Sequence, residues 1–373
     1  MSLHLKLIII AILFGGCHYT SDRSGVPVNT STEMPYVAAS LQPGVTNVHT
    51  LYQNSDFPAV SGNDLEQAIR SIPEFSSFIL YRDGEIISEM YKNGGAANRP
   101  ANIKSASKSI LSALTGIALR EGFIESIDDP LSGYLPGYFD GIDDSLKHQI
   151  TIRHLLMMKS GLRSTSFGNY GAWVVSRDWV GYAIRGPQVH PPGRSMAYST
   201  GDTHILSAVL SEASGMSTRQ LAERYLFTPM NQGIGGWDRD PQGYFFGGNN
   251  MALSPYALLE FGRLYLNGGM YNGVQVLDPE WIQKSLTTYQ HGISFNSRRH
   301  DYGYLWWHNT FGGHSVWFAW GYGGQYLFLI PEMDAVVVLT GNPDTRSRGM
   351  NNRIYSIMET TVIPYLAGST KRD

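Results

Sequence analysis

Strand-like segments lie near both ends of this 373-residue chain, and a long helical stretch separates them. The strand-like segments are rich in aromatic and β-branched residues or flank the turn Arg82-Asp83-Gly84, and they cover residues 77–81, 85–91, 302–307, 315–320, 325–330 and 335–340. Helix-like periodicity covers residues 64–72, 153–158, 203–213, 218–226, 256–266 and 351–366. Strands from both ends can share one sheet only if the helical stretch is an insertion. We therefore expect an α/β (α+β) domain in which one antiparallel sheet is flanked by N- and C-terminal helices and carries an inserted helical lobe.

These segments place the folded domain at residues 56–373. We expect its sheet lobe at about residues 56–104 and 295–373, and its helical lobe at about residues 105–294. Residues 18–55 are rich in Ser, Thr, Pro, Asn and Gly, a composition typical of a tether or a loosely packed N-terminal arm. The net charge of −3 and the absence of a basic cluster argue against nucleic acid as a partner.

The first residues have the pattern of a targeting signal. Lys6 precedes an apolar run over residues 7–14, which is too short to span a bilayer and ends in Gly15-Gly16-Cys17. The lone cysteine at this point is similar to that of a bacterial lipobox, so we expect residues 1–17 to be a lipoprotein signal peptide with Cys17 lipidated. The protein would then be anchored in the bacterial cell envelope, on the periplasmic or extracellular side, with no other membrane contact. The alternative is an ordinary signal peptide with an incidental cysteine.

Another helix is predicted to begin at the segment Ser105-Ala106-Ser107-Lys108, and Gly122 would end it. Its apolar positions recur at intervals of three and four, namely Ile110, Leu111, Leu114, Ile117 and Ala118. Residues three apart lie on one face of a helix, so the Lys108 amine can reach the Ser105 hydroxyl. The first helical turn would also stabilise negative charge on the serine oxygen. A serine and a lysine at this spacing occur by chance in many chains, so the remaining sequence must supply the context.

Further motifs follow Ser105 in a fixed order. They are Asp128-Asp129-Pro130, Ser160-Gly161-Leu162, Tyr198-Ser199-Thr200, Gly303-Tyr304-Leu305-Trp306-Trp307 and Gly321-Tyr322-Gly323-Gly324-Gln325. As a set, within about residues 64–364, they resemble the superfamily of serine β-lactamases and penicillin-binding proteins, on the branch of class C-like esterases and 6-aminohexanoate-dimer hydrolases. This resemblance implies the β-lactamase/transpeptidase-like fold and a serine hydrolase that needs no cofactor.

The resemblance also implies a role for each catalytic residue. Ser105 would attack the carbonyl carbon, Lys108 would accept or relay the serine proton, and Tyr198 would pass a proton to the leaving group. Which of Lys108 and Tyr198 is the general base stays open, because both have an unperturbed pKa near 10. The alternative for Tyr198 is a core tyrosine. Thr200, a candidate substrate-binding residue, stands where relatives have Asn or Ser, and it keeps a hydroxyl group.

An oxyanion hole requires two backbone N–H groups, which by resemblance belong to Ser105 and Tyr322. Three glycines beside Tyr322 would let the backbone approach a substrate, so Gly321, Gly323 and Gly324 are candidate binding residues. The alternative for these glycines is a hairpin turn or a bulge. Trp306 and Trp307 are candidate aromatic walls for an uncharged acyl or amide group, and the alternative is that they belong to the sheet core.

One departure from the family pattern bears on the substrate. β-Lactamases and peptidases of this superfamily carry Lys-Thr-Gly or His-x-Gly on the strand beside the site, and no such triplet stands before Tyr322. We therefore expect hydrolysis of a small ester or linear amide through an acyl-enzyme on Ser105. The alternatives are a β-lactamase or D-alanyl-D-alanine carboxypeptidase, or a non-catalytic cell-envelope binding or sensing module. The 11 histidines form no metal-binding motif, so we expect no metal ion.

Overall fold

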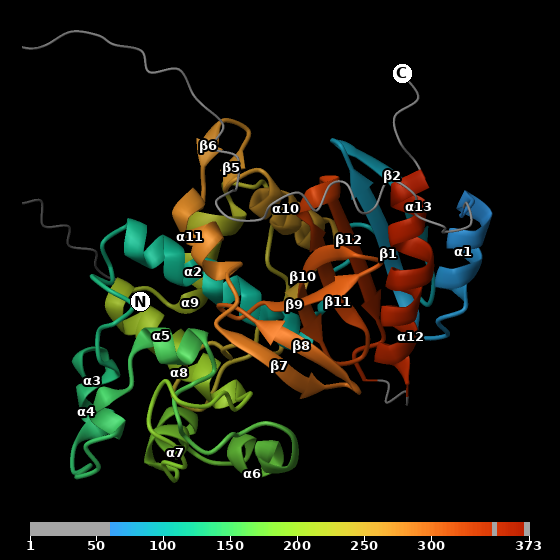
Figure 1. The fold of residues 1–373 in the computed structure, drawn as a ribbon. Helices are drawn as coiled ribbons and strands as arrows, with labels where there is room; N and C mark the ends of the chain where they lie inside the picture. Colours follow the sequence, from blue (N-terminus) through green and yellow to red (C-terminus); the bar gives the residue numbers. More distant parts are fainter. Residues whose placement is uncertain (1–59, 345–348, 369–373) are drawn as a thin grey trace, which may run out of the picture. The chain divides into compact units, whose positions relative to one another are not determined.

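The computed structural model describes residues 60–344 and 349–368. The expected signal peptide with Cys17 and the arm over residues 18–55 lie outside the described residues. An eight-stranded antiparallel sheet forms the largest element, in the strand order β2-β1-β12-β11-β10-β9-β8-β7 (Figure 1). The strands are β1 (Phe75–Arg82), β2 (Glu85–Tyr91), β7 (Gln290–Phe295), β8 (Arg298–Tyr302), β9 (Trp307–Phe311), β10 (His314–Gly321), β11 (Gln325–Ile330) and β12 (Ala335–Gly341).

The two parts of the sheet that are far apart in sequence meet at β1 and β12. These strands pair antiparallel, with Ile79 opposite Val338 and Arg82 opposite Ala335. All residues of β11 and β12 are buried, as expected for strands that are covered on both faces. The expected fold class, an antiparallel sheet built from both ends of the domain, is confirmed.

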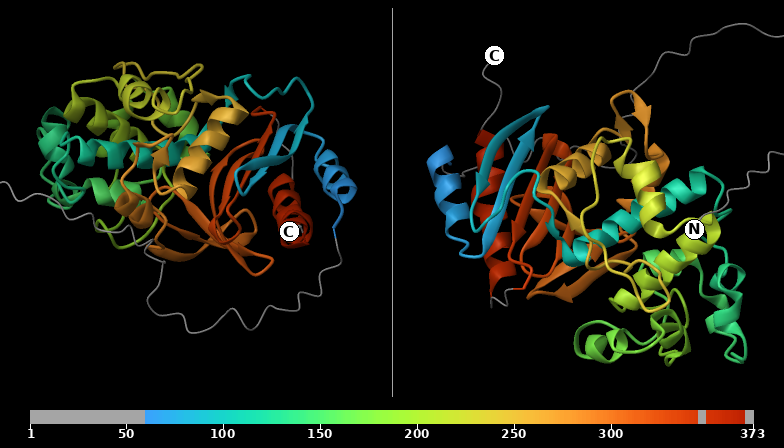
Figure 2. Two further views of the ribbon diagram at one scale, coloured as in Figure 1. Left: turned by 90° about the horizontal axis from the view of Figure 1, so that it is seen from above. Right: turned by 180° about the vertical axis from the view of Figure 1, so that it is seen from behind.

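Helices cover both faces of this sheet (Figure 2). On one face lies α10 (Pro255–Leu266), where Gly262 brings the helix backbone close to Leu327 and Leu329 of β11. On the other face, α12 (Met350–Ile357) places Tyr355 against Phe318 and Tyr326. The alternation of neighbouring residues 326 and 327 between the faces follows from the two-residue period of a strand. The same second face carries α1 (Gly62–Arg70) and α13 (Ile363–Gly368), with a π-helical turn, Met358–Val362, between α12 and α13.

The segment between β2 and β7 is mainly helical and contains the inserted part of the fold. Its helices are α2 (Ser107–Arg120), α3 (Leu131–Tyr134), α4 (Pro136–Phe139), α5 (Ile152–Leu156), α6 (Tyr170–Val174), α7 (Trp179–Arg185), α8 (Thr200–Ser214), α9 (Thr218–Ala222), α10 and α11 (Pro279–Ser285). Two short strand pairs also lie here, β3 (Ala101–Asn102) with β4 (Ala252–Leu253) and β5 (Met270–Tyr271) with β6 (Val274–Gln275). Helix α2 is buried over most of its length and packs against α8. Within the described ranges, no helix is long and apolar enough to cross a membrane.

The prediction of a strand at residues 302–307 is wrong. Strand β8 ends at Tyr302 and β9 begins at Trp307, and a tight turn joins them through a hydrogen bond from the Gly303 N–H to the Trp306 carbonyl. Leu305 in this turn has φ of 61°, a conformation that no strand allows. Residues 302–307 have the aromatic composition of a buried strand, but in the structure these buried residues form a turn. The sequence reading also missed β7 and the short helices α3, α4, α6, α7 and α11.

Candidate active site

Ser105 lies in a 3-10 turn, Lys104–Ala106, that leads directly into α2. Helix α2 itself begins at Ser107, so the serine precedes the helix rather than lying in its first α-helical turn. Asn102 fixes the entry by accepting a hydrogen bond from the Lys104 N–H at 2.8 Å. The Ser105 side chain is half-buried, so it can meet a substrate. The predicted end of the helix is confirmed, since Gly122 has φ of 72° directly after the cap residue.

Lys108 lies beneath Ser105, and only 2% of its surface is exposed. Its Nζ is 3.1 Å from the Ser105 Oγ, 3.3 Å from the Thr200 Oγ1 and 2.7 Å from the Gly248 carbonyl oxygen. Burial disfavours the charged amine and lowers the pKa of Lys108 to about 7. A substantial fraction of the amine is therefore neutral near pH 7, and the neutral form has a lone pair that can accept the serine proton.

Tyr198 lies two residues before the start of α8, with its ring close to the lysine amine. The Lys108 Nζ is 5.2 Å from the centre of the Tyr198 ring. The phenol oxygen is buried and has no well-aligned hydrogen bond within the described residues. Burial raises the pKa of Tyr198, and the Ser105 hydroxyl opposes this with a smaller effect in the other direction. The phenol is therefore protonated at neutral pH, and it lies close enough to Ser105 for the serine hydroxyl to affect its pKa.

Thr200 occupies the first position of α8 and is almost fully buried. Besides its contact with Lys108, its hydroxyl lies 3.0 Å from the Ser166 Oγ, which also accepts a hydrogen bond from the Thr200 N–H at 2.9 Å. Ser166 thus holds the start of α8 through two bonds. Because Thr200 is buried and contacts the lysine amine, it is better placed to hold that amine than to bind a large substrate group.

Gly321 ends β10 beside the Ser105 turn. A Cβ atom on Gly321 would lie 2.2 Å from the Ile103 carbonyl oxygen and 3.2 Å from the Ala106 nitrogen, so only glycine allows this approach. Tyr322 follows, with a side chain that is 42% exposed. Among the hydrogen bonds of the described residues, neither its backbone N–H nor that of Ser105 has an acceptor, so both stay candidate oxyanion donors.

Gly323 and Gly324 form the turn between β10 and β11, with φ of 79° and 82°. A Cβ on Gly323 would meet the Asn342 carbonyl oxygen at 2.5 Å, and one on Gly324 would meet the Met350 sulfur at 2.8 Å. Both glycines are therefore required by the packing of the turn, the alternative considered from the sequence.

The two candidate tryptophans differ. Trp306 is fully buried and packs on Phe261 and Tyr265, the α10 side of the sheet, so its expected place in a substrate wall is wrong. Trp307 is also buried, but its ring stacks on Tyr198 with centroids 5.6 Å apart. It therefore packs against the ring of Tyr198 rather than forming an open wall of the site.

The sequence reading missed several residues at this site. Phe167 and Phe295 lie with their ring centres 6.0 Å from that of Tyr198, and Phe167 is 64% exposed. Ser166 and Gly248 were missed as well. Gly248 acts through its backbone carbonyl, for which side-chain identity gives no signal. The cavities of about 300, 600 and 550 Å³ elsewhere on the described surface do not include Ser105, Lys108 or Tyr198.

Comparison with known proteins agrees with this architecture. The 6-aminohexanoate-dimer hydrolase of Paenarthrobacter ureafaciens is 24% identical over 311 residues, which are 76% of this chain and 77% of that protein. A Bacillus anthracis structure with a provisional 6-aminohexanoate-dimer hydrolase name superposes with a TM-score of 0.68 at 19% identity, covering 86% of this chain and 87% of that one. A D-stereospecific amidohydrolase from Streptomyces sp. has a TM-score of 0.63 at 17% identity, covering 80% and 98%.

The sequence model of one protein family covers most of the domain. The family is described as Beta-lactamase, and the match runs over residues 67–361, from α1 to the π-helical turn after α12. This range includes the Ser105 turn, Lys108, the start of α8 and the end of β10. The chain therefore belongs to the Beta-lactamase family of serine hydrolases.

Proposed function

We propose that Ser105 is the nucleophile of this serine hydrolase, and that it cleaves an ester or linear amide through an acyl-enzyme. One observation carries the assignment: a fully buried lysine amine lies 3.1 Å from the hydroxyl of a half-buried serine. In the first step the Ser105 oxygen forms a bond to the substrate carbonyl carbon and its proton passes to Lys108. The leaving alcohol or amine then departs with a proton, and water hydrolyses the acyl-serine by the reverse route.

Lys108 is the better candidate for the general base. Its pKa of about 7 leaves a neutral amine available, whereas the raised pKa of Tyr198 keeps the phenol protonated. Tyr198 is then the proton donor to the leaving group, and Lys108 returns the proton through the phenol. The opposite pKa shifts of the two residues support this division, which the residue types alone left open.

The oxyanion would be bound by the N–H groups of Ser105 and Tyr322. Gly321 supports this pairing, because it lets the end of β10 touch the Ser105 turn. Loss of one such donor typically costs about 3 to 4 kcal/mol of transition-state stabilisation.

The substrate class follows from the walls beside Tyr198. The rings of Phe167 and Phe295 lie beside Tyr198. Strand β10 carries no basic residue from Ser315 to Gly321, whereas carboxylate-binding enzymes of this superfamily carry one on that strand. An uncharged acyl or amide group fits such a wall better than a carboxylate. The relatives named for the 6-aminohexanoate dimer and for D-stereospecific amides support a linear amide as one substrate. A β-lactamase or D-alanyl-D-alanine carboxypeptidase is the alternative.

We also propose that Cys17 carries a lipid that holds the enzyme on the periplasmic or extracellular side of a bacterial membrane. The sequence Gly15-Gly16-Cys17 after an apolar run supports this location. Expression of the full chain and Cys17→Ala in a bacterial host, followed by membrane fractionation and mass spectrometry of the N-terminus, tests it. Equal amounts of both proteins in the membrane fraction would contradict the anchor.

The test of the nucleophile is covalent labelling followed by mass spectrometry. A fluorophosphonate probe should label Ser105 in the wild type and leave Ser105→Ala unlabelled, and the variant should hydrolyse a p-nitrophenyl ester at no more than a few per cent of the wild-type rate. Wild-type protein that takes up no probe would instead support the non-catalytic binding or sensing module. Turnover of nitrocefin at rates above those for esters and linear amides would favour the β-lactamase alternative.

A further inference from the structure

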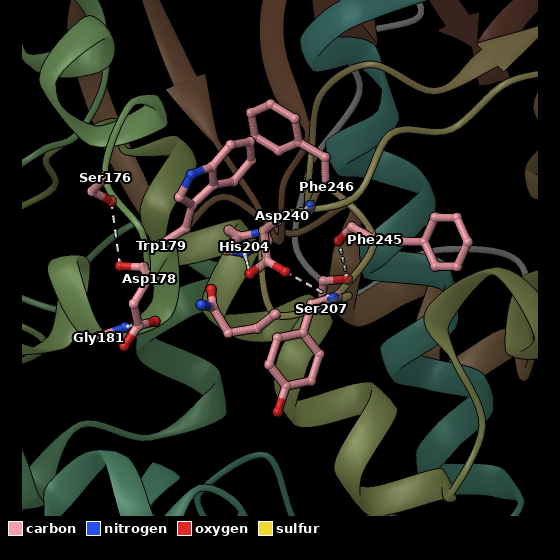
Figure 3. Close-up of polar contacts among 12 residues, drawn as sticks. Ser176, Asp178, Trp179, Gly181, His204, Ser207, Asp240, Phe245 and Phe246 are labelled. Atoms are coloured by element: carbon pink, nitrogen blue, oxygen red, sulfur yellow. Dashed lines mark hydrogen bonds and ion pairs between the residues drawn. The ribbon is translucent and has the colours of Figure 1, made fainter.

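A buried histidine lies one helical turn from Thr200 and takes no part in the chemistry described above. The Nε2 of His204, in α8, lies 2.9 Å from the Oδ2 of Asp240, and both side chains have 0% exposure. Trp173, Trp179 and Phe246 surround the imidazole, with ring centres 5.3 to 5.9 Å away. Figure 3 shows His204 and Asp240 together with Trp179 and Phe246.

The other imidazole nitrogen fixes the tautomer. The Gly247 N–H donates to the His204 Nδ1 at 3.2 Å, which requires an unprotonated Nδ1. The ring proton is then on Nε2, where it is donated to Asp240. Asp240 in turn accepts the Tyr244 N–H at 2.8 Å, so the carboxylate joins the imidazole to the turn over residues 240–244.

The loop that continues from this turn, residues 245–248, is held by α8 through two further hydrogen bonds. The Thr203 hydroxyl donates to the Gly247 carbonyl at 3.0 Å, and the Ser207 hydroxyl donates to the Phe245 carbonyl at 2.8 Å. The residues at 203, 204 and 207 lie on one face of a helix, so one face of α8 holds the backbone of residues 245–247.

This loop ends on the catalytic lysine. The Gly248 carbonyl accepts the Lys108 amine at 2.7 Å, and a Cβ on Gly248 would lie 2.5 Å from the Lys108 Cγ. Gly247 and Gly248 are both buried, and Gly248 packs directly on the side chain of Lys108. A chain of direct contacts therefore runs from Asp240 through His204 and the loop backbone to Lys108.

We propose that His204, oriented by Asp240, is a positioning residue that keeps the Gly247-Gly248 segment over Lys108 and so holds the amine against Ser105. The role rests on the proposed function, in which Lys108 accepts the serine proton. If the Gly247 N–H loses its acceptor, the segment can move away from α8 and admit water to the amine. The amine then loses both its carbonyl partner and the burial that keeps it neutral.

Two substitutions at His204 separate this role from a packing role. His204→Phe keeps an aromatic ring and removes the acceptor for Gly247, whereas His204→Asn keeps an acceptor close to the position of Nδ1. The third variant is Asp240→Asn. The carboxylate accepts hydrogen bonds from the His204 Nε2–H and the Tyr244 N–H, one on each oxygen. In the variant an NH₂ donor replaces one of these oxygens, so one of the two bonds is lost. Leu65→Ala, in the buried face of α1, is the control for lost stability without any contact to the loop.

The readout is the titration of the Lys108 amine, measured by trace acetylation with acetic anhydride from pH 5 to 10 and peptide mass spectrometry. This measurement does not depend on turnover. The wild-type midpoint should lie at about 7. We expect it to rise by about one pH unit or more in His204→Phe and Asp240→Asn and to stay near the wild-type value in His204→Asn and Leu65→Ala.

The second readout is kcat for a p-nitrophenyl ester, divided by the amount of serine that a fluorophosphonate can titrate. We expect a decrease of about tenfold or more in His204→Phe, with recovery in His204→Asn, because a misplaced catalytic group slows the reaction in every folded molecule. An unchanged Lys108 midpoint and unchanged kcat in both His204→Phe and Asp240→Asn would overturn the positioning role. A wild-type serine that takes no probe would overturn the proposed function, whatever the lysine titration shows.

Discussion

The buried amine of Lys108 should make the protein less stable while making it reactive, and Lys108→Met tests both effects. A pKa lowered from 10.5 to about 7 corresponds to about 5 kcal/mol, because one pKa unit is worth about 1.4 kcal/mol. The sign follows from the protons bound in each state. Between about pH 7 and pH 10.5 the unfolded chain holds a proton that the folded chain releases, so the free energy of unfolding rises with pH through this window. Below about pH 7 both states are protonated and the full cost remains.

Methionine has a similar length and no charge, so Lys108→Met removes this cost. It also removes the hydrogen bond to the Gly248 carbonyl, and a buried carbonyl without a partner costs about 1 to 3 kcal/mol. At pH 7, where the lysine penalty is about 4 kcal/mol, we expect the variant to be more stable than the wild type by about 1 to 3 kcal/mol. At pH 9.5 the penalty has fallen by about 3 kcal/mol, so the advantage should vanish or reverse.

Urea unfolding at pH 7 and pH 9.5 measures this difference, with p-nitrophenyl ester hydrolysis in parallel. Lys92→Met, at an exposed position after β2, is the matched control and should show no pH-dependent difference from the wild type. Activity of Lys108→Met should fall by about a hundredfold or more. A stability difference that is the same at both pH values would show that the folded lysine is charged, and it would refute the assignment of Lys108 as a neutral base.

Three further predictions follow from the same geometry. Tyr198→Phe should lower turnover by about a hundredfold, the usual scale of proton donation, while fluorophosphonate labelling of Ser105 persists; normal ester turnover would remove the phenol from the mechanism. Gly321→Ala should displace the Ser105 turn, because the new methyl group would lie 2.2 Å from the Ile103 carbonyl oxygen, and esterase activity should fall at least about tenfold. Phe167→Ala should raise KM for long acyl chains and leave kcat for acetyl esters near the wild-type value, because Phe167 is 64% exposed and lies beside the ring of Tyr198, with ring centres 6.0 Å apart. Equal KM changes for short and long acyl chains would exclude Phe167 from the acyl wall.

The sequence predicted those helices whose positions are determined by the spacing of their apolar side chains. The helices α2, α8 and α10 were predicted close to their observed positions, because their apolar residues recur with the period of a buried helix face. The association of Ser105 and Lys108 followed from spacing within one helical segment. The strand prediction at residues 302–307 was wrong because a hydrophobic composition indicates that residues are buried but does not determine the direction of the backbone. Strand β7 of the β7–β8 hairpin was not predicted, because it is a polar strand at the edge of the sheet and is only partly buried.

The groups that tune the site were not predictable in the same way. Gly248 contributes a carbonyl group, which every residue type carries, so its identity gives no signal. Tyr322 was named as an N–H donor only through the family resemblance, and that role stays a prediction. The contact between Phe167, in a short 3-10 helix, and Phe295, at the end of β7, joins segments more than a hundred residues apart in the chain, and no local pattern encodes such a contact. Trp306 and Trp307 are adjacent and both buried, yet only the second touches Tyr198. Their difference depends on the turn through Leu305, which the composition of the segment conceals.

The stack of Tyr198 on Trp307 connects two requirements of the reaction. Tyr198 precedes α8 in the inserted part of the chain, whereas Trp307 begins β9 and pairs with Phe318 of β10, the strand that ends at Gly321. The proposed proton donor Tyr198 and the end of β10 proposed to bind the oxyanion therefore both contact the same part of the sheet. A shift of α8 relative to the sheet would change the distance from the phenol to the oxyanion donors, and the aromatic stack opposes that shift. If the proposed roles hold, the buried ring of Trp307 does more than fill the core, because it fixes the position of the Tyr198 phenol relative to the end of β10.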